Sequence, residues 1–552
     1  MNTHIWKPRS TWGLIVVALL AAGISTGAQE PRSATPKVVT IAGRPYPVHP
    51  APLPARIDLP SPGVSQEEAE YQPERRPMDP RFPPANSRTA ETEALPTHSR
   101  LVLTSSGTYL TDGFAWAKRT ALSKVPPDNG GCYQAALPDR GGYCQRDFVH
   151  QIDGAALLGL HRENLAMLRQ FASHQTEARG WFTLWEINYD GSPMACDYRD
   201  DRHFWRNTAG MFDLIHGAYR QYLWTANPAL VEDPILHGFY SRTVNEFVAA
   251  HDRDGNGIVE GQAATGWGIA CTYNEMPGIV LAESADSLGT QRRAFEAYAG
   301  FLRARGDGAG AEAWAAKAER LRRAFNDTWY DVAAGRYRIG FDHPGRRPVT
   351  GFGYETSWFI PYTGLCEPGA RATAYLDFIH DRFQAKPSPN IEAWTYLPDV
   401  FYSWNQKERG WRYFQHVLDS RSRYPEVSFA VISHIATRIL GIEPDAPRRA
   451  VTTLGRLPAE VAWAQLDHVP VGVNEVLVRH EDGNRTTTLA NHAGPDLTWE
   501  ALFPGEHAVL LVDDAPRTPT AKAQNGTRVS GVTVTVKTGQ RRFVKVPESL
   551  GQ

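Results

Sequence analysis

Apolar residues recur at helical spacing through the middle of the chain. Between about residues 108 and 440 they stand at i, i+3, i+4 and i+7, as in "FWRNTAGMFDLIHGAYRQYLW" and "ALVEDPILHGFYSRTVNEFVAAH". Clusters of Gly, Pro and Asn interrupt this pattern and divide the region into about twelve helices. The predicted spans are 108–123, 146–159, 161–175, 203–224, 229–251, 277–305, 309–331, 353–361, 367–383, 394–403, 406–420 and 427–440.

The pattern changes after Gly441. Short β-branched runs such as "EVLVRHED" and "GVTVTVKTG" alternate with period two and are separated by turn residues, which predicts a C-terminal antiparallel β-sandwich. Runs of helices followed by runs of strands indicate separate domains rather than a βαβ sheet. The expected fold class is mainly α, with a helical domain over 99–445 and a β-sandwich domain over 446–552.

Residues 1–98 carry neither pattern. Lys7 and Arg9 precede the apolar run "WGLIVVALLAAGIS", and the small residues Thr26 and Ala28 follow it, so residues 1–28 are predicted to be a secretory signal peptide. The run is shorter than the roughly 20 residues that span a bilayer, which favours a cleaved signal over a membrane anchor. We therefore expect a periplasmic or extracellular protein with no membrane span after cleavage. Residues 29–98 are rich in proline and predict an extended arm or linker.

Charge and cysteine content narrow the expected partners. Lys+Arg 58 against Asp+Glu 60 gives a net charge of -2, without the basic excess that nucleic acid or an anionic membrane would require. Export would allow the cysteines to form disulfides, and we expect the pairs Cys132–Cys144 and Cys196–Cys271, which leaves Cys366 unpaired. A zinc site is disfavoured because the chain has no CxxC pair.

The connections between the predicted helices alternate in character. Twelve antiparallel helices can close into a double ring, in which every second connection lies on the same rim. Connections from even to odd helices are short and plain, such as "GLH" and "SWNQ". Connections from odd to even helices are long and rich in Trp, Tyr, Asp, Glu and Arg, such as "RGWFTLWEINYDGSPMACDYRDDRH". Aromatic faces stack on sugars, and carboxylates and Arg bind hydroxyls, so one rim is predicted to form a carbohydrate-binding cleft.

At this point the chain resembles the six-hairpin (α/α)6 glycosidases, the glucoamylase-like and α-L-rhamnosidase-like enzymes. "YCQRDFVHQIDGAALLGL" is similar to a glucoamylase segment at the start of the second helix, which implies that Arg146 and Asp147 hold the sugar of the innermost subsite. "DGNGIVEGQAATGW" lies after the fifth helix, where such enzymes carry the general acid. "YPEVSFAVISHIATRILGI" resembles the start of their last helix, close to the general base.

Glu260 is the candidate general acid, because nearby Trp267 would provide the partly dry setting that raises a carboxyl pKa. The same stretch resembles half of an EF-hand loop, with Asp252, Asp254 and Asn256 as the calcium ligands. Loop position 12, which needs a bidentate carboxylate, is Ala263, so the sequence favours the catalytic interpretation and predicts no metal or other cofactor. Glu260 as a helix cap is the structural alternative.

Two residues compete for the general base. Glu426 stands where the resemblance places the base, although an acid at a helix N-terminus also suits the helix dipole. Glu392 in "NIEAWTY" has the more aromatic setting. A further set of polar and aromatic residues in the long connections is predicted to contact substrate rather than to react. These residues are Arg146, Asp147, His150, Trp185, Glu186, Asp200, Asp201, Trp267, Tyr354, Glu355 and Trp394.

The sequence thus predicts an exported glycoside hydrolase, exo-acting and inverting, whose partner is a carbohydrate substrate. Inversion would need the two carboxyl groups roughly 6.5–9.5 Å apart, with a water between them. One rival is a polysaccharide lyase on a helical toroid, which would need cationic groups beside a uronate where this rim is acidic. The other rival is a sugar-binding protein without catalysis. No nucleophile elbow or phosphate-binding glycine motif supports acyl, phosphoryl or hydride transfer.

Overall fold

The computed structural model describes the backbone of residues 37–41, 44–48 and 57–58, and it describes residues 99–125, 131–138, 140–263, 268–273, 280–343, 345–388 and 390–547. The predicted signal peptide lies outside this part of the chain. Within the arm predicted over 29–98, strands β1 (Lys37–Ile41) and β2 (Arg44–Val48) pair antiparallel. Strand β3 (Ile57–Asp58) pairs parallel with β13 (Pro348–Thr350). The domain boundaries stay a prediction.

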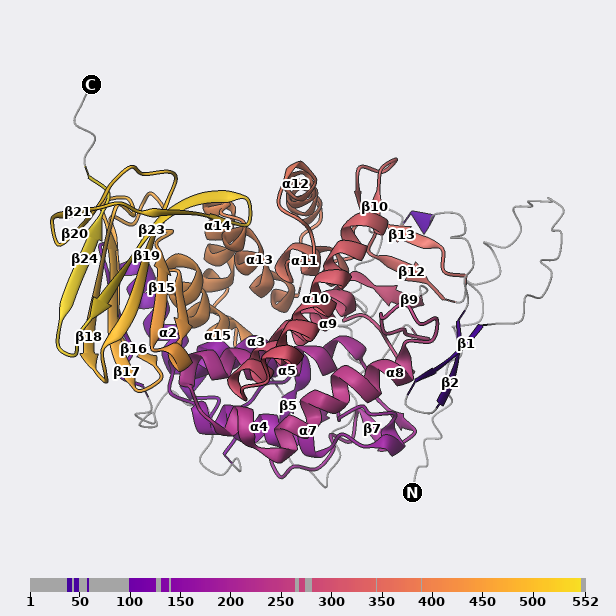
Figure 1. Cartoon of the computed structure of the whole chain (residues 1–552). Coiled ribbons are helices and arrows are strands. Elements are labelled where there is room, and N and C mark those ends of the chain that lie inside the picture. Colours follow the sequence, from indigo (N-terminus) through magenta and orange to yellow (C-terminus); the bar gives the residue numbers. More distant parts are fainter. Residues whose placement is uncertain are drawn as a thin grey trace, which may run out of the picture.

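Each predicted helix has a counterpart among the described residues, and the helices form the expected double ring (Figure 1). Six inner helices contact one another in sequence, and the ring closes where the last of them packs on the first. The inner helices are α3 (Gln145–Leu157), α5 (Thr208–Thr225), α9 (Ala285–Ala304), α11 (Glu355–Tyr362), α13 (Ile391–Ser403) and α15 (Pro425–Ser433). The outer helices are α2 (Thr108–Leu122), α4 (His161–Ser173), α7 (Pro234–Arg242), α10 (Gly308–Thr328), α12 (Ala370–Ala385) and α14 (Lys407–Asp419).

Two helices begin later than predicted because polar residues cap them. Asn207 accepts a hydrogen bond from the backbone of Ala209 and begins α5, after strand β8 (His203–Phe204). Ser284 accepts from the backbone of Ser287 and begins α9, after strand β9 (Leu281–Ser284). The fifth predicted helix is broken into α6 (Ala229–Glu232), α7 and α8 (Val248–His251), with Asp233 capping α7. Such caps satisfy the backbone N–H groups that a helix start leaves free.

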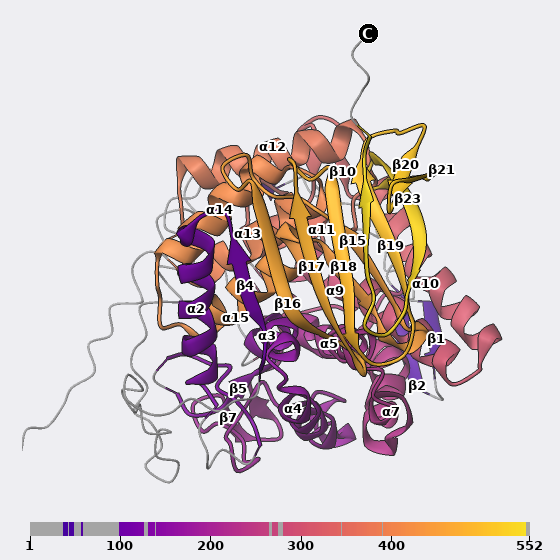
Figure 2. The ribbon, with the colours of Figure 1, turned by 90° about the vertical axis from the view of Figure 1, so that its left-hand side faces the viewer.

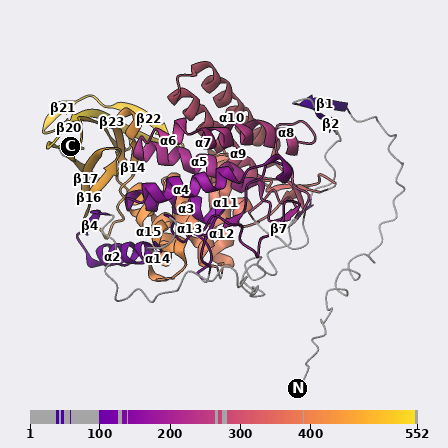
Figure 3. The same cartoon turned by 90° about the horizontal axis from the view of Figure 1, so that it is seen from below.

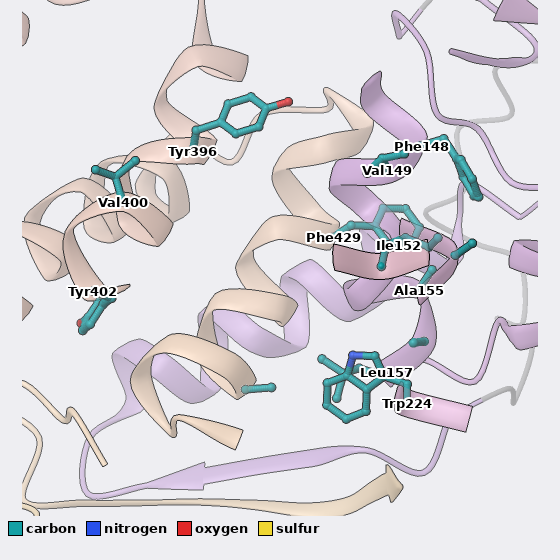
Figure 4. Packing of buried hydrophobic residues seen from close by; sticks show 14 of the residues in the cluster. Phe148, Val149, Ile152, Ala155, Leu157, Trp224, Tyr396, Val400, Tyr402 and Phe429 are labelled. Carbon is teal, nitrogen blue, oxygen red and sulfur yellow. The ribbon is translucent and has the colours of Figure 1, made fainter. Parts of the chain in front are cut away.

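Inner helices pack on both sides, and their residues are therefore almost all buried. All residues of α15 are buried, and its Phe429 lies against α3. Figure 4 shows Ile152 of α3 and Phe429 of α15 among the buried side chains of this contact. The helices approach so closely that a Cβ added to Gly154 would lie 2.4 Å from the carbonyl oxygen of Phe429. This contact closes the ring.

Replacing Gly154 with Ala should therefore destabilise the protein, although Ala is the better helix former. The added methyl group would meet backbone rather than a movable side chain, and such overpacking costs about 1–3 kcal/mol. Gly308→Ala is the matched control, since nothing lies within 4 Å of its added Cβ at the start of α10. Urea unfolding of the two variants measures the difference. Equal midpoints would show that the contact between α3 and α15 is looser than described.

The C-terminal residues form two facing sheets that cover one end of the ring (Figures 1 and 2). The five-stranded sheet has the order β14-β15-β19-β23-β22. Its strands are β14 (Ile442–Asp445), β15 (Ala450–Leu454), β19 (Leu497–Pro504), β23 (Thr527–Val536) and β22 (Thr520–Gln524). Its pairs are antiparallel except β15 with β19, which is parallel. The predicted β-sandwich is thus present, with one parallel pair.

The seven-stranded sheet has the order β21-β20-β24-β18-β17-β16-β4. Its C-terminal strands are β21 (Ala515–Arg517), β20 (Leu510–Val512), β24 (Arg541–Lys545), β18 (Thr486–Ala493), β17 (Asn474–Glu481) and β16 (Trp463–Val471). Its edge strand β4 (Val102–Ser105) comes from the chain before the first helix and pairs antiparallel with β16. Figure 2 shows β4 beside β16, so both ends of the helical region meet at the sandwich.

Two further findings bear on the predicted location and on cysteine pairing. No helix in the described part of the chain combines the length and apolar composition needed to cross a membrane. The expected disulfides are wrong, because the cysteines, all among the described residues, are free. Cys144 is the N-cap of α3 and is buried, and Cys271 is buried with its thiol donating to the carbonyl of Leu281, 3.2 Å away.

Candidate active site

The inner helices all begin on the same rim of the ring, and most of them begin with an acid. The long connections predicted from the sequence lead into this rim. Figure 3 shows the helices and their connections with the molecule seen from below. Carboxylates are favoured here because the N-terminus of a helix carries a partial positive charge. The acids in the first turns of α3, α9, α11, α13 and α15 are Asp147, Asp286, Glu355, Glu392 and Glu426, respectively.

Asp147, Glu392 and Glu426 come together in what we call the carboxylate cluster. One oxygen from each lies within 4.8 Å of one from each of the others. Glu426 is far from Asp147 in sequence and reaches it because α15 closes on α3. Asp147 is 3% exposed, Glu392 is 4% exposed and Glu426 is fully buried. The ring thus assembles one predicted subsite residue and both predicted bases at one point.

Arg146 and Tyr424 hold the outer side of the carboxylate cluster. The Arg146 guanidinium forms an ion pair with Glu392, with Nη2 2.6 Å from Oε1, and it lies over the ring of Tyr273. The Tyr424 hydroxyl lies 3.0 Å from Asp147 Oδ1 and 3.2 Å from Glu392 Oε2, so it can donate to either carboxylate. Arg146 therefore binds Glu392 directly, while the Tyr424 hydroxyl bridges Asp147 and Glu392.

His150 lies beneath the cluster, one helical turn after Asp147. Its Nδ1 is 3.3 Å from Glu426 Oε1, and its Nε2 is 3.9 Å from Asp399 Oδ2. The imidazole stacks on the Tyr396 ring, with centroids 3.9 Å apart and an interplanar angle of 7°. His150 is 6% exposed, so the structure places this predicted substrate contact between two buried carboxylates.

Burial and mutual repulsion leave protons on the carboxylate cluster. Burial, followed by the charges of Glu426 and Glu392, raises the pKa of Asp147 well above its usual value. Burial and the charge of Glu392 also raise the pKa of Glu426, although His150 and Arg146 oppose this. Three carboxylates so close together titrate as a unit, and the protons belong to the group. The arrangement can therefore offer a carboxylic acid and a carboxylate side by side.

Glu260 belongs to a second acidic group, the Arg346 cluster, which contains Asp254, Glu260, Glu283 and Arg346. The Arg346 guanidinium contacts Glu260 through Nη1, and its Nη2 lies 2.5 Å from Glu283 and 2.9 Å from Asp254. The other Glu260 oxygen accepts from the backbone N–H of Arg253, 3.0 Å away. Burial and then Asp254 raise the pKa of Glu260, against the opposing charge of Arg346. Glu260 joins this cluster and does not contact the carboxylate cluster in the described residues.

The calcium-like stretch is closed by hydrogen bonds within the chain. Asp252 accepts from the backbone N–H groups of Gly255 and Gly257, both at 2.9 Å. The Asn256 side chain donates to Glu283, 2.7 Å away, and accepts from the backbone of Ile258. Asp254, which the EF-hand interpretation would use as a calcium ligand, pairs with Arg346. A guanidinium thus supplies the positive charge that the acids around this loop require.

Trp185 and Glu186 lie close to Arg146 but differ in their surroundings. Trp185 is 9% exposed, and its ring centroid lies 6.3 Å from that of Tyr273, the residue under Arg146. Glu186 is buried and pairs with Arg140, with 2.6 Å between Nη1 and Oε2. Trp185 is therefore linked to Arg146 only through Tyr273, whereas Glu186 anchors the loop before α3.

The other predicted contacts are dispersed. Asp200 and Asp201 bind within their own loop, Asp200 to His203 at 2.8 Å and Asp201 to Arg179 at 2.7 Å. Trp394 stacks on His416 of the outer helix α14, with centroids 3.5 Å apart. The last three predicted contacts are Tyr354, Glu355 and Trp267. Tyr354 and Glu355 are buried at the start of α11, and Trp267 lies outside the described residues.

Sequence reasoning missed Tyr424, Asp399 and His434. Tyr424 stands two residues before Glu426, so the aromatic residue in "YPEV" was an available signal. Asp399 stands seven residues after Glu392, and that spacing places two helical residues on one face. Nothing local marks His434, whose Nε2 lies 3.2 Å from Asp399 Oδ2 only because α15 packs beside α13.

No family model matches the chain, and no curated protein is significantly similar to it in sequence. Solved structures do match. The chain has the (α/α)6 fold of the six-hairpin glycosidases, as the resemblance predicted. An α-L-rhamnosidase from Dictyoglumus thermophilum aligns with a TM-score of 0.56 at 13% identity, over 82% of this chain and 50% of that one.

Two further structures extend this comparison. A rhamnosidase of family GH78 from Bacillus sp. GL1 aligns with a TM-score of 0.53 at 13% identity, over 72% of this chain and 42% of that one. A protein described as a kojibiose phosphorylase from the human microbiome aligns with a TM-score of 0.52 at 6% identity, over 80% of this chain and 63% of that one. The chain spans about half the length of these rhamnosidases, and the likeness is one of fold.

Proposed function

We propose that the protein is an exported glycoside hydrolase and that the carboxylate cluster is its catalytic centre. The observation that carries this proposal is the convergence of Asp147, Glu392 and Glu426 at the N-terminal rim of the inner ring. Glycosidic cleavage needs one carboxylic acid to protonate the leaving oxygen and one carboxylate to act as base or nucleophile. Buried carboxyl groups that share protons beside an arginine meet this requirement.

Asp147 is the acid in this proposal, and Glu392 is the carboxylate. Asp147 has its pKa raised by burial and by two neighbouring carboxylates, which keeps a proton available. Glu392 is held by the Arg146 guanidinium, whose Nη2 lies 2.6 Å from Oε1. Glu426 lies deepest and contacts His150 rather than the outer face. Arg146 is held from below by the buried ring of Tyr273, and Trp185 lies 6.3 Å from that ring.

Glu260 remains the rival acid, and the stereochemistry separates the two assignments. Inverting enzymes hold their carboxyl groups about 6.5–9.5 Å apart, whereas retaining enzymes hold them about 5–5.5 Å apart. The cluster oxygens, within 4.8 Å of one another, are closer than inversion requires. The predicted inversion would therefore need an acid outside the cluster, such as Glu260 on the side of α9. Exo-action is also part of the proposal, because long connections such as those that lead into this rim tend to enclose a site at one end.

A hydrolysis screen tests the proposal. Purified protein is incubated with aryl glycosides, α-L-rhamnosides and α-glucosides first, and the anomer of the first sugar product is followed by NMR. We expect free sugar to form, with turnover lost in Asp147→Asn and kept in Glu260→Gln. A retained anomer supports the cluster pair, and an inverted anomer together with loss of activity in Glu260→Gln transfers the acid role to Glu260.

The remaining outcomes would reject the proposal. Phosphate-dependent release of a sugar phosphate would indicate a phosphorylase on this fold. An absorbing unsaturated uronate product would indicate a lyase. Binding of glycans without turnover of any of them would leave a carbohydrate-binding protein whose carboxylates only accept hydrogen bonds from sugar hydroxyls.

A further inference from the structure

Beneath the carboxylate cluster, a row of charged groups runs into the core of the ring. Asp399 on α13 contacts Arg438 through Oδ1, and its Oδ2 lies 3.2 Å from His434 Nε2 and 3.9 Å from His150 Nε2. On its other side, His150 Nδ1 lies 3.3 Å from Glu426. His150 is therefore a buried imidazole between two carboxylates, and nothing in the proposed hydrolysis yet uses it.

We propose that His150, held as an imidazolium between Asp399 and Glu426, is a positioning residue that keeps the carboxylate cluster at a single proton. With one proton on three carboxyl groups, the cluster carries two negative charges. Arg146 balances one of them through Glu392, and the imidazolium balances the other through Glu426. The charge of Asp399 is matched by Arg438. With one bound proton, the cluster contains both a carboxylic acid and a carboxylate that can act as a base.

The surroundings of His150 favour its charged form. Burial alone would make the imidazole neutral, but the carboxylates of Asp399 and Glu426 raise the pKa of His150 to about 9. His434, which shares Asp399, has its pKa lowered by burial and is neutral. The stack on Tyr396 adds the attraction of a cation for an aromatic face. The imidazolium thus has Glu426 at 3.3 Å from Nδ1, the charge of Asp399 at 3.9 Å from Nε2, and an aromatic ring on one face.

Other titratable groups act on the same centre from the helices packed around α3. Burial alone would raise the pKa of Asp399, but Arg438, His434 and His150 together hold that pKa well below its usual value, so Asp399 stays ionised. The remaining groups belong to α3, α5, α11, α13 and the turns after and before α15. They are Arg146, Asp147, Asp213, Tyr362, Glu392, Tyr396, Tyr424, His434 and Arg438. A change confined to His150 leaves all of these in place.

His150→Asn is the informative variant, because its amide can still donate to Glu426 but carries no charge. Without the imidazolium, the cluster should take up a second proton more readily. The acidic limb of the kcat/KM profile should then move to higher pH by about one unit or more, since a neighbouring opposite charge shifts a carboxyl pKa by about 1–3 units. A merely structural role would lower turnover at every pH and leave the limb where it is. An unmoved limb in an active variant overturns the proposal.

His416→Asn is the matched control. His416 also stacks on an aromatic ring, Trp394, but it stands on the outer helix α14 and does not contact the cluster. The acidic limb of the kcat/KM profile of His416→Asn should stay where it is in the unchanged protein. A shift equal to that of His150→Asn would attribute the effect to loss of packing.

The charge of His150 can also be observed without any substrate. The kinetic test rests on the proposed function, whereas this one does not. In protein labelled with ¹⁵N-histidine and assigned by comparison with His150→Asn, the His150 ring should keep imidazolium shifts up to about pH 9. A ring that titrates near its ordinary value of 6.5 overturns the proposal even if the protein hydrolyses glycosides. A raised value in a protein that cleaves no glycoside would reject only the enzymatic function.

Discussion

Replacing Asp147 with Asn, or Glu392 with Gln, is expected to lower kcat by a factor of about 100 to 10,000 on any glycoside that the protein cleaves. Each change removes one of the two proton-transfer groups and keeps the size of the side chain. The neighbours of Asp147 and Glu392 remain, because Tyr424 can still donate to either position. Steady-state rates at saturating substrate, measured beside thermal unfolding, separate lost chemistry from lost folding.

Glu163→Gln is the control for these two variants. Glu163 also stands in the first turn of a helix, but that helix is the outer α4, which begins on the opposite rim. Its removal should change the rate by less than a factor of two or so, because no proton transfer depends on it. Undiminished turnover in both Asp147→Asn and Glu392→Gln would move the catalytic centre away from the carboxylate cluster.

Replacing Arg346 with Met is expected to cost about 3–5 kcal/mol of the free energy of unfolding, because removing one partner of a buried ion pair leaves uncompensated charge. Arg346 contacts Glu260, Glu283 and Asp254 at once. Burial raises the pKa of Glu283 to about 7 even beside this guanidinium, so without it the group should take up a proton. Urea unfolding at pH 8 and pH 5 measures the loss, which should be smaller at pH 5.

The neighbouring residue supplies a matched control for Arg346. Arg347 pairs with Asp342 at 2.7 Å, but its side chain is 51% exposed, so Arg347→Met should cost about 1 kcal/mol or less. Millimolar calcium should raise the urea-unfolding midpoint of Arg346→Met part of the way back and should leave that of Arg347→Met unchanged. The reason is that oxygens of Asp254, Glu260 and Glu283 lie within 4.8 Å of one another and could bind the ion. Equal losses in the two variants would mean that the three carboxylates do not depend on Arg346.

The ring was predictable because it depends on repeated local patterns. Period-3.6 spacing marks each helix, and the alternation of short and long connections marks which rim carries the site. Arg146, Asp147, Glu392 and Glu426 could therefore be placed on one rim from sequence, and three of these four form the cluster itself. Local sequence patterns do not show which of these acids come together in the folded protein. Glu426 reaches Asp147 because α15 closes on α3, a contact between opposite ends of the helical region.

The partners of buried charges were also hidden from the sequence. Arg346 is the clearest case, since nothing in "HPGRRPVT" distinguishes it from Arg347, yet only one of them reaches Glu260. The disulfide expectation failed for a related reason. The positions of cysteines along the chain do not show whether their Cα atoms approach within the few ångströms that a bridge requires. Both errors concern pairing across the fold rather than the elements themselves.

The pairing of strand β4 with β16 sets an order for the folding steps of the chain. Val102 pairs with Asp467 and Ser105 with Ala464, so the segment ahead of the first helix finds its hydrogen-bonding partner only when β16 exists. During synthesis, all six hairpins would leave the ribosome before this pairing can occur. Shortened chains that end before Trp463 should therefore expose β4 as an unpaired edge and aggregate.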